Sequence, residues 1–205
     1  MAKFKLTKTE LKTQTDALKR FCRFLPMLQL KKQQLQSEIA GIAAKADAVA
    51  AKEKEVRSSL ERWAGLLATD ESQLEGLVKI LGVKTGEANI AGVAIPTFES
   101  LDIDVRKIDP WSTPAWVDDA VVAAKEILTL RQERAVYDEQ RRLVTEELRQ
   151  TSQRVNLFEK VKIPECKEAI RVIKIALGDE QTAAVTRGKI AKSRGSGSVQ
   201  EETAR

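Results

Sequence analysis

The chain has 205 residues, of which 32% are charged and only 4% are aromatic, with a net charge of +5 and no histidine. This balance favours long, solvated helices over a thick globular core. The lack of histidine removes the usual general base and the commonest metal ligand, and no Gly-rich phosphate-binding motif is present. We therefore expect a non-catalytic chain with no cofactor and no metal.

The sequence has no segment of the roughly 20 apolar residues that a membrane-spanning helix needs. Its first residues, MAKFKLTKTELK, have no signal-peptide hydrophobic core. We expect a cytoplasmic protein without membrane insertion. The two cysteines, Cys22 and Cys166, have neither metal-ligand spacing nor a disulfide framework, and we expect reduced packing residues.

Residues 1–68 are predicted to form a first long coiled-coil helix. Apolar residues recur there in steps of three and four, and only Lys32 and Glu53 interrupt the series. A repeat of about 3.5 residues that persists this long is typical of a coiled-coil seam. The seam positions are Leu18, Phe21, Leu25, Leu28, Leu35, Ile39, Ile42, Ala46, Val49, Val56, Leu60, Trp63 and Leu67.

Residues 69–112 are predicted to form an insert that contains a β-hairpin. The stretch LVKILGVKTGEANIAGVAIPTF has β-branched residues, a glycine-containing turn region and a proline that ends the second run. Trp63, Trp111 and Trp116 lie near the edges of the insert, where we expect aromatic packing against the helices.

A second coiled-coil helix is predicted over residues 113–194. Thr113 is a suitable N-cap, Pro114 suits the first helical position, and two aspartates follow near the positive end of the helix dipole. The apolar series is Ile127, Leu130, Tyr137, Val144, Leu148, Val155 and Phe158, with Arg134, Arg141 and Thr151 at intervening positions. The low-complexity segment 195–205 is predicted to be a disordered tail.

The predicted fold is therefore mainly α. A short insert requires the second helix to fold back along the first, which gives a long antiparallel two-helix coiled coil with a small β-hairpin between its helices. Placing Leu67 opposite about residue 118 makes the numbers of paired residues sum to 185–190. Pro26 and Pro164 then share one level, where we predict a bend or a loosened section, and Cys22 lies near Cys166.

The apolar frame of the second helix changes near Pro164. After Phe158 the earlier frame would bury Lys162 and Glu165, whereas the apolar residues resume one position later. The new series is Ile163, Cys166, Ile170, Ile173 and Leu177. Such a slip of one residue indicates a local change in the winding of the coiled coil.

Charge is distributed unevenly along the chain. Residues 1–35 have a net charge of +7, residues 36–153 a net charge of −6, and residues 154–194 a net charge of +5. In an antiparallel hairpin, the end with the free termini is positive. A basic end indicates an acidic protein partner, nucleic acid or an anionic surface. Aromatic residues interleaved with the basic ones would favour nucleic acid, and the sequence does not have them.

Three segments resemble the D subunit, the central-stalk axle, of V-type and archaeal A-type rotary ATPases. The C-terminal segment RVNLFEKVKIPECKEAI carries most of the resemblance, at Arg154, Val155, Asn156, Leu157, Glu159, Ile163 and Pro164. In the insert, NIAGVAIP fits the family pattern at Asn89, Gly92, Val93 and Pro96. The first helix is similar at Leu28, Lys31, Lys32 and Leu35, and departs from the family at Phe24 and Pro26.

The resemblance implies a non-catalytic rotor subunit that couples ATP hydrolysis or synthesis in a catalytic hexamer to ion translocation by a membrane ring. It implies as partners the catalytic and non-catalytic nucleotide-binding subunits of the hexamer, the small F subunit of the central stalk and the funnel-shaped subunit above the membrane ring. It also implies a location in the cytoplasm, peripheral to the membrane. No direct contact with nucleic acid is implied.

Three sets of residues are expected to serve this function. Positive side chains contribute to a bearing surface at the basic end: Arg20, Arg23, Lys31, Lys32, Lys167, Arg171, Lys189 and Lys192. Residues of the insert engage a stalk partner: Asn89, Gly92, Val93 and Pro96. Pro26 and Pro164 bend the axle and give it a preferred direction.

Simpler roles stay open for each set. The charges can be scattered and solvated, the hairpin can merely cap the helices, and the prolines can lie unrelated on exposed faces. Two alternative functions also remain: a non-rotary coiled-coil scaffold, which predicts a homodimer, and a basic helical protein that binds nucleic acid with strong salt dependence.

Overall fold

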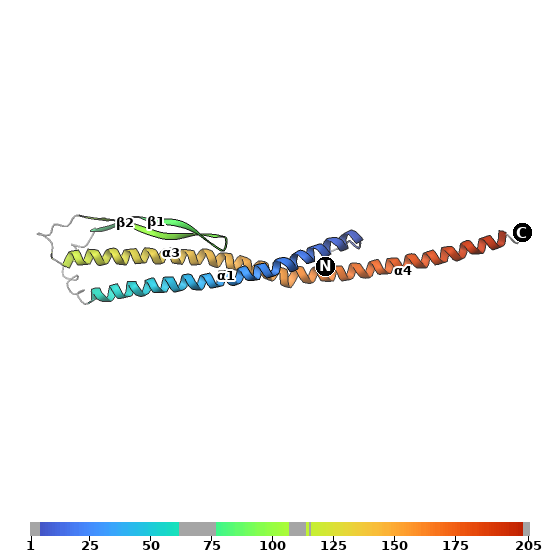
Figure 1. Ribbon diagram of the computed structural model, residues 1–205, viewed down its shortest axis with the longest axis horizontal. Helices are drawn as coiled ribbons and strands as arrows, with labels where there is room; N and C mark the ends of the chain where they lie inside the picture. The colour runs from blue at the N-terminus through green and yellow to red at the C-terminus, as the bar shows by residue number, and fades with distance from the viewer. Residues whose placement is uncertain (1–4, 62–76, 107–113, 115, 203–205) are drawn as a thin grey trace. The chain divides into compact units, whose positions relative to one another are not determined.

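The computed structural model describes residues 5–61, 77–106, 114 and 116–202, with side chains described as far as residue 193. Along the chain follow α1 (Lys8–Glu61), β1 (Val78–Ile90), β2 (Val93–Val105), α3 (Trp116–Leu157), the π-turn η2 (Phe158–Lys162) and α4 (Ile163–Glu202) (Figure 1). The chain divides into two compact units. We call Leu30–Ser152 the hairpin unit, and Met1–Gln29 with Gln153–Arg205 the terminal unit.

The predicted fold class is confirmed. The chain is mainly helical, and a two-stranded antiparallel hairpin lies in the sequence between the long N-terminal and C-terminal helices. The expected N-cap Thr113 and two of the tryptophans, Trp63 and Trp111, lie outside the described residues. Trp116 is at the start of α3, where the N–H of Val117 donates to the carbonyl of Pro114. At the other end, α4 continues to Glu202, into the segment where the low-complexity sequence predicts disorder.

The core of the hairpin unit joins three elements. Leu35 and Ile42 of α1, Ile95 of β2 and Val144 of α3 are buried and form one cluster. Apolar side chains from the helices and the hairpin cover it: Ile39, Ala88, Ile90, Ala91, Val93, Tyr137 and Leu148. Figure 1 shows the hairpin running alongside α3 in this unit. Burial of apolar surface, the main favourable term in folding, thus holds the hairpin to both helices.

The hairpin turn has a conformation typical of a two-residue loop. Ile90 pairs with Val93, so Ala91 and Gly92 form the turn, with φ angles of 52° and 85°. Positive φ at both central residues is the type I′ geometry that matches the twist of the strands. The side chain of Asn89 stabilises it, because its Oδ1 accepts a hydrogen bond of 2.9 Å from the N–H of Gly92.

The terminal unit is packed more sparsely. The rings of Phe21 on α1 and Phe158 lie with centroids 5.0 Å apart. Among the described residues, the buried apolar side chains of this unit all come from α3 and α4: Val155, Cys166, Ala169 and Ile173. From residue 178 to residue 193, every side chain of α4 is exposed.

The predicted slip in the apolar frame coincides with the π-turn. The N–H of Ile163 donates to the carbonyl of Phe158, five residues earlier. A π-turn holds one residue more than an α-helical turn, so apolar positions after it are displaced by one residue. Cys166 and Ile173, in the new frame, are buried as a result. Pro164 comes directly after the turn, within the first turn of α4, where a missing N–H is tolerated.

The predicted register between the helices was wrong for three of the observed contacts. In the hairpin unit, Lys31 pairs with Glu147 and Glu53 with Arg131, so paired numbers sum to 178 and 184 rather than 185–190. In the terminal unit, Phe21 and Phe158 give 179. The prediction started from Leu67, which lies outside the described residues.

Burial is the main cause of the raised pKa of Cys166, and Cys22 adds to it, so these two cysteines, whose numbers sum to 188, lie near each other as the register predicted. Cys166 is buried as expected of a packing residue, whereas Cys22 is exposed. A common level for Pro26 and Pro164 stays a prediction. The helix α1 continues through Pro26, which is exposed.

Candidate interaction surfaces

The eight predicted bearing residues are divided between the two units. Lys31 and Lys32 belong to the hairpin unit and are half-buried, whereas the other six belong to the terminal unit and are exposed. Those six are Arg20, Arg23, Lys167, Arg171, Lys189 and Lys192. The structure therefore does not bring all eight residues into one compact unit.

Two of the eight charges are already paired within the chain. The Nζ of Lys31 lies 2.6 Å from Oε1 of Glu147, which connects α1 to α3. Arg171 pairs with Glu168 on its own helix at 2.7 Å, and this hydrogen bond raises the pKa of Arg171 and lowers that of Glu168. The other six predicted bearing residues make no ion pair within the described part of the chain, so their charges are open to a partner.

The four predicted residues of the insert all have a role inside the hairpin unit. Asn89 and Gly92 shape the turn, and Val93 packs against the core. The carbonyl of Pro96 accepts a hydrogen bond of 2.5 Å from Nε2 of Gln140, a buried residue of α3. These contacts explain the residue types of Asn89, Gly92 and Val93, whereas the bond to the carbonyl of Pro96 does not require a proline. Partner binding by these four residues stays a prediction.

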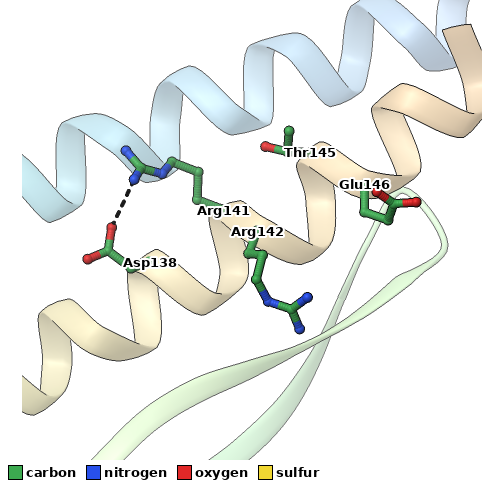
Figure 2. A pocket seen from close by; sticks show the side chains of 5 residues that line it. All are labelled: Asp138, Arg141, Arg142, Thr145 and Glu146. Carbon is green, nitrogen blue, oxygen red and sulfur yellow. Dashed lines mark ion pairs between the residues drawn. The ribbon is translucent and has the colours of Figure 1, made fainter.

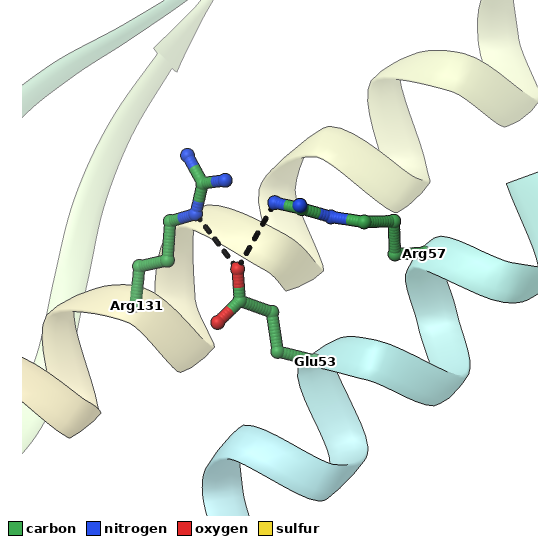
Figure 3. A network of polar contacts seen from close by, with 3 residues as sticks. All are labelled: Glu53, Arg57 and Arg131. Carbon is green, nitrogen blue, oxygen red and sulfur yellow. Dashed lines mark hydrogen bonds and ion pairs between the residues drawn. The ribbon is translucent and has the colours of Figure 1, made fainter.

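Two features of this unit were not predicted from the sequence. The sequence did not indicate the role of Gln140, apart from its position one helical turn before the seam residue Val144. Glu53 was recognised as an interruption of the seam, but its partners were not, and it is the clearest electrostatic feature between α1 and α3 (Figure 3). Its Oε1 lies 2.8 Å from Nε of Arg131 and 3.4 Å from a terminal nitrogen of Arg57.

The surroundings of Glu53 stabilise its charged form. The hydrogen bond from Arg131 lowers the pKa of Glu53, and the charges of Arg131, Arg57 and Arg134 act in the same direction. Partial desolvation of the carboxylate opposes this shift, with an effect smaller than that of the hydrogen bond but larger than that of any one of the charges. Glu53 therefore remains an ion-pair partner at neutral pH, although it stands at a seam position where an apolar residue would be usual.

A shallow cleft on α3 has neighbouring charges of both signs. Asp138, Arg141, Arg142, Thr145 and Glu146 line it, and Figure 2 shows Arg141 and Arg142 extending to different sides of the helix. Arg141 pairs with Asp138 at 3.3 Å, and Arg142 pairs with Glu139 at 2.6 Å. Acidic neighbours on the same helix neutralise both arginines. We therefore do not interpret this cleft as a catalytic or binding site.

The exposed end of α4 has no apolar partner among the described residues of its unit. Val185 and Ile190 are 59% and 48% exposed, and Thr182 and Thr186 bond their hydroxyls to carbonyls one turn earlier. A single helix that is solvated on all sides is marginal in water, because most helix stability in proteins comes from packing. Residues 178–193 are therefore a candidate surface for another protein.

Neither a metal centre nor a membrane span is formed by the part of the chain that the structure describes. Within those ranges, no group of three or more His, Cys, Asp or Glu side chains could hold a metal ion. None of the helices in the same ranges combines the length and the apolar character that crossing a bilayer requires.

The two long helices, their apolar seam and the hairpin packed on it define a helical coiled-coil subunit. A family model described as the ATP synthase D subunit matches residues 10–193. The chain is 44% identical over 193 residues to the V-type ATP synthase D subunit of Borreliella burgdorferi, an alignment that covers 94% of this chain and 95% of that protein.

Two chlamydial proteins of the same name are also similar. The protein of Chlamydia felis is 32% identical, with 94% of each chain covered. That of Chlamydia muridarum is 33% identical, with 94% of this chain and 96% of the relative covered. The chain belongs to the ATP synthase D-subunit family.

Proposed function

We propose that this chain is the central-stalk rotor subunit of a V/A-type ATP synthase. It mechanically couples ATP hydrolysis or synthesis in a catalytic hexamer to ion translocation by a membrane ring, and it performs no bond chemistry itself. The observation that carries the proposal is the match to the D-subunit family over residues 10–193. The complex is bound to the membrane, and this subunit lies at its cytoplasmic side.

The contacts within the hairpin unit support a role of this unit in transmitting torque. A shaft made of two helices transmits rotation only if the helices do not slide past each other. The core cluster and the ion pairs Lys31–Glu147 and Glu53–Arg131 oppose such sliding, because they join α1 to α3 at separate points. Close packing resists deformation, and interiors of this kind transmit strain.

The features of the terminal unit support contact with a surrounding protein. Its exposed basic side chains and the solvated end of α4 suit a bore lined by complementary charge and apolar surface. We propose that this unit meets the catalytic and non-catalytic nucleotide-binding subunits. Rotation and ATP turnover are then coupled through contact energies that differ between orientations of the axle.

The other proposed partners are the small F subunit of the stalk and the funnel-shaped subunit above the membrane ring. Asn89, Gly92, Val93 and Pro96 are proposed to contribute to contact with a stalk partner. The π-turn and Pro164 are proposed to give the terminal unit an asymmetric shape, with Pro26 contributing on α1. Replacing both prolines by alanine should then lower coupling efficiency, and unchanged torque and coupling would refute the role of the prolines.

The proposal is tested by affinity purification of the tagged full chain from gently solubilised membranes in moderate salt. Mass spectrometry should identify a catalytic ATPase ring and a small soluble stalk protein. Recovery of the chain alone as a homodimer would favour the scaffold, and recovery of nucleic acid lost at high salt would favour the nucleic-acid binder. Truncation after residue 177 should reduce recovery of the ring if the end of α4 contacts it.

A further inference from the structure

A pocket between α1 and α3 carries more positive charge than its one carboxylate balances. Ala50, Glu53, Lys54, Arg57 and Arg134 line this pocket in the hairpin unit. Arg131 lies directly beside it, bonded to Glu53 (Figure 3). Four cations thus surround one carboxylate, although residues 36–153 as a whole have a net charge of −6. The positive charge is therefore local and does not belong to a generally basic face.

Within the described ranges, most hydrogen-bond donors of these arginines have no partner. Both arginine contacts to Glu53 go to the same oxygen, Oε1, and the contact from Arg57 is long at 3.4 Å. A guanidinium carries five N–H donors, so each of these arginines has several left. Lys54 and Arg134 make no ion pair in the part of the chain that the structure describes.

We propose that the pocket bounded by Lys54, Arg57 and Arg134 binds a phosphate-type oxyanion. The fork of an arginine matches the oxygens of a phosphate in a bidentate arrangement, and the lysine adds a compact positive charge. Glu53 acts as a positioning residue, because it holds the Arg57 side chain toward α3. The site goes beyond the proposed rotor function, and it can be tested on the isolated full chain.

The size and the charge of the pocket favour a small dianion. Its volume is about 220 Å³, below the roughly 300–1,000 Å³ of pockets that bury a drug-sized ligand. The lining has three cations and one carboxylate, and this excess of two positive charges suits a doubly charged tetrahedral anion better than a single carboxylate.

Isothermal titration calorimetry of the full chain with sodium phosphate tests this proposal, with ionic strength kept constant by sodium chloride. The double variant K54Q/R134Q should reduce the affinity about tenfold or more, because charge-assisted hydrogen bonds are lost. The matched control K45Q/K125Q removes two exposed charges from the same helices outside the pocket and should bind as the unmodified chain does.

One further variant and two further anions test whether the binding is specific to this pocket and to tetrahedral oxyanions. E53Q keeps an amide oxygen that can accept the hydrogen bond from Arg57 but removes the competing negative charge, so it should bind phosphate several-fold more tightly, an effect that a merely structural role of Glu53 would not produce. Sodium sulfate should bind similarly to phosphate, whereas acetate at equal ionic strength should not bind. Equal affinity of K54Q/R134Q and the unmodified chain would overturn the proposal, and so would acetate binding as strong as that of phosphate.

Discussion

The same two helical segments are held together differently in the two units. In the hairpin unit, α1 contributes four buried side chains, Leu35, Ile42, Ala46 and Val49, and a hairpin adds a third layer over the core. In the terminal unit, α1 contributes no buried side chain among its described residues. The terminal unit still buries side chains of α3 and α4, such as Ile173, so the hairpin layer coincides mainly with burial of the α1 side of the seam.

Electrostatic contacts show the same contrast. In the described residues, ion pairs between α1 and α3 occur in the hairpin unit, whereas those of the terminal unit connect neighbours three residues apart. Local opening costs less free energy where few apolar contacts are buried. We expect the terminal unit to be the part of the free chain that opens first and that gains most from a partner.

Truncation of the apolar seam should have the largest effect, and it should differ between the units. L35A removes a fully buried side chain from the three-element core and should lower the free energy of unfolding by about 2–5 kcal/mol. L18A truncates a half-buried seam residue of the terminal unit and should cost roughly 1 kcal/mol. Urea denaturation followed by circular dichroism measures both, and equal losses would contradict the comparison.

Loss of the hydrogen bond between α3 and the hairpin should have the next largest effect. Q140L keeps the side-chain volume similar but leaves the carbonyl of Pro96 without its donor, which should cost about 1–3 kcal/mol. Hydrogen exchange of residues 93–98 should accelerate in this variant. Q34L, an exposed position on α1, is the control and should change neither quantity.

Replacement of a buried hydroxyl should stabilise the hairpin unit. Thr151 is 1% exposed and its Oγ1 has no hydrogen-bond partner among the described residues. T151V keeps the shape and removes the unpaired polar group, so it should raise the free energy of unfolding by about 1 kcal/mol. The exposed T145V is the control, and a loss of stability in T151V would contradict this account.

The Glu53 ion pairs should make a smaller, pH-dependent contribution. The pKa of Glu53 is lower in the folded chain than its ordinary value of 4.5, mainly because of the hydrogen bond from Arg131. The stabilisation is therefore fully present above about pH 4.5 and is lost as pH falls below it. Because the side chains of Arg57 and Arg131 are about half exposed, we expect these ion pairs to contribute only about 0.5–1 kcal/mol to the free energy of unfolding. In E53Q, the free energy of unfolding measured by urea denaturation should depend less on pH in this acidic range. The control E55Q, at an exposed position, should keep the pH dependence of the unmodified chain.

Deletion of one residue in the π-turn should have almost no effect on stability when it is made in a P164A background, which keeps a proline out of the resulting continuous helix. Removing Lys160 would bring Phe158 and Ile163 into one continuous α-helical frame, so the seam on both sides is kept. Deletion of the exposed Thr145 shifts Val144 relative to Leu148 instead and should cost several kcal/mol. Urea denaturation compares the two deletions, and a large loss for Lys160 would show that the π-turn is needed for packing.

Much of the fold could be predicted from the residue pattern. The 3.5-residue repeat from Leu18 onward predicts the first helix, and the run around Asn89 predicts the hairpin, because both patterns reflect local periodicity. The slip after Phe158 also predicts a local irregularity, although its form as a π-turn became known only from the structure. Register was less predictable, since a heptad pattern fits several pairings that differ by whole turns.

The sequence by itself determined the helices, the hairpin and the charge of the two ends, because periodicity and composition are properties of neighbouring residues. Only the tertiary structure decided which residues meet across elements. Pairing of Glu53 with Arg131, bonding of Gln140 to Pro96 and the contact of Phe21 with Phe158 join positions far apart in the chain. Such contacts depend on register and on the hairpin's place against both helices, and local patterns do not encode either.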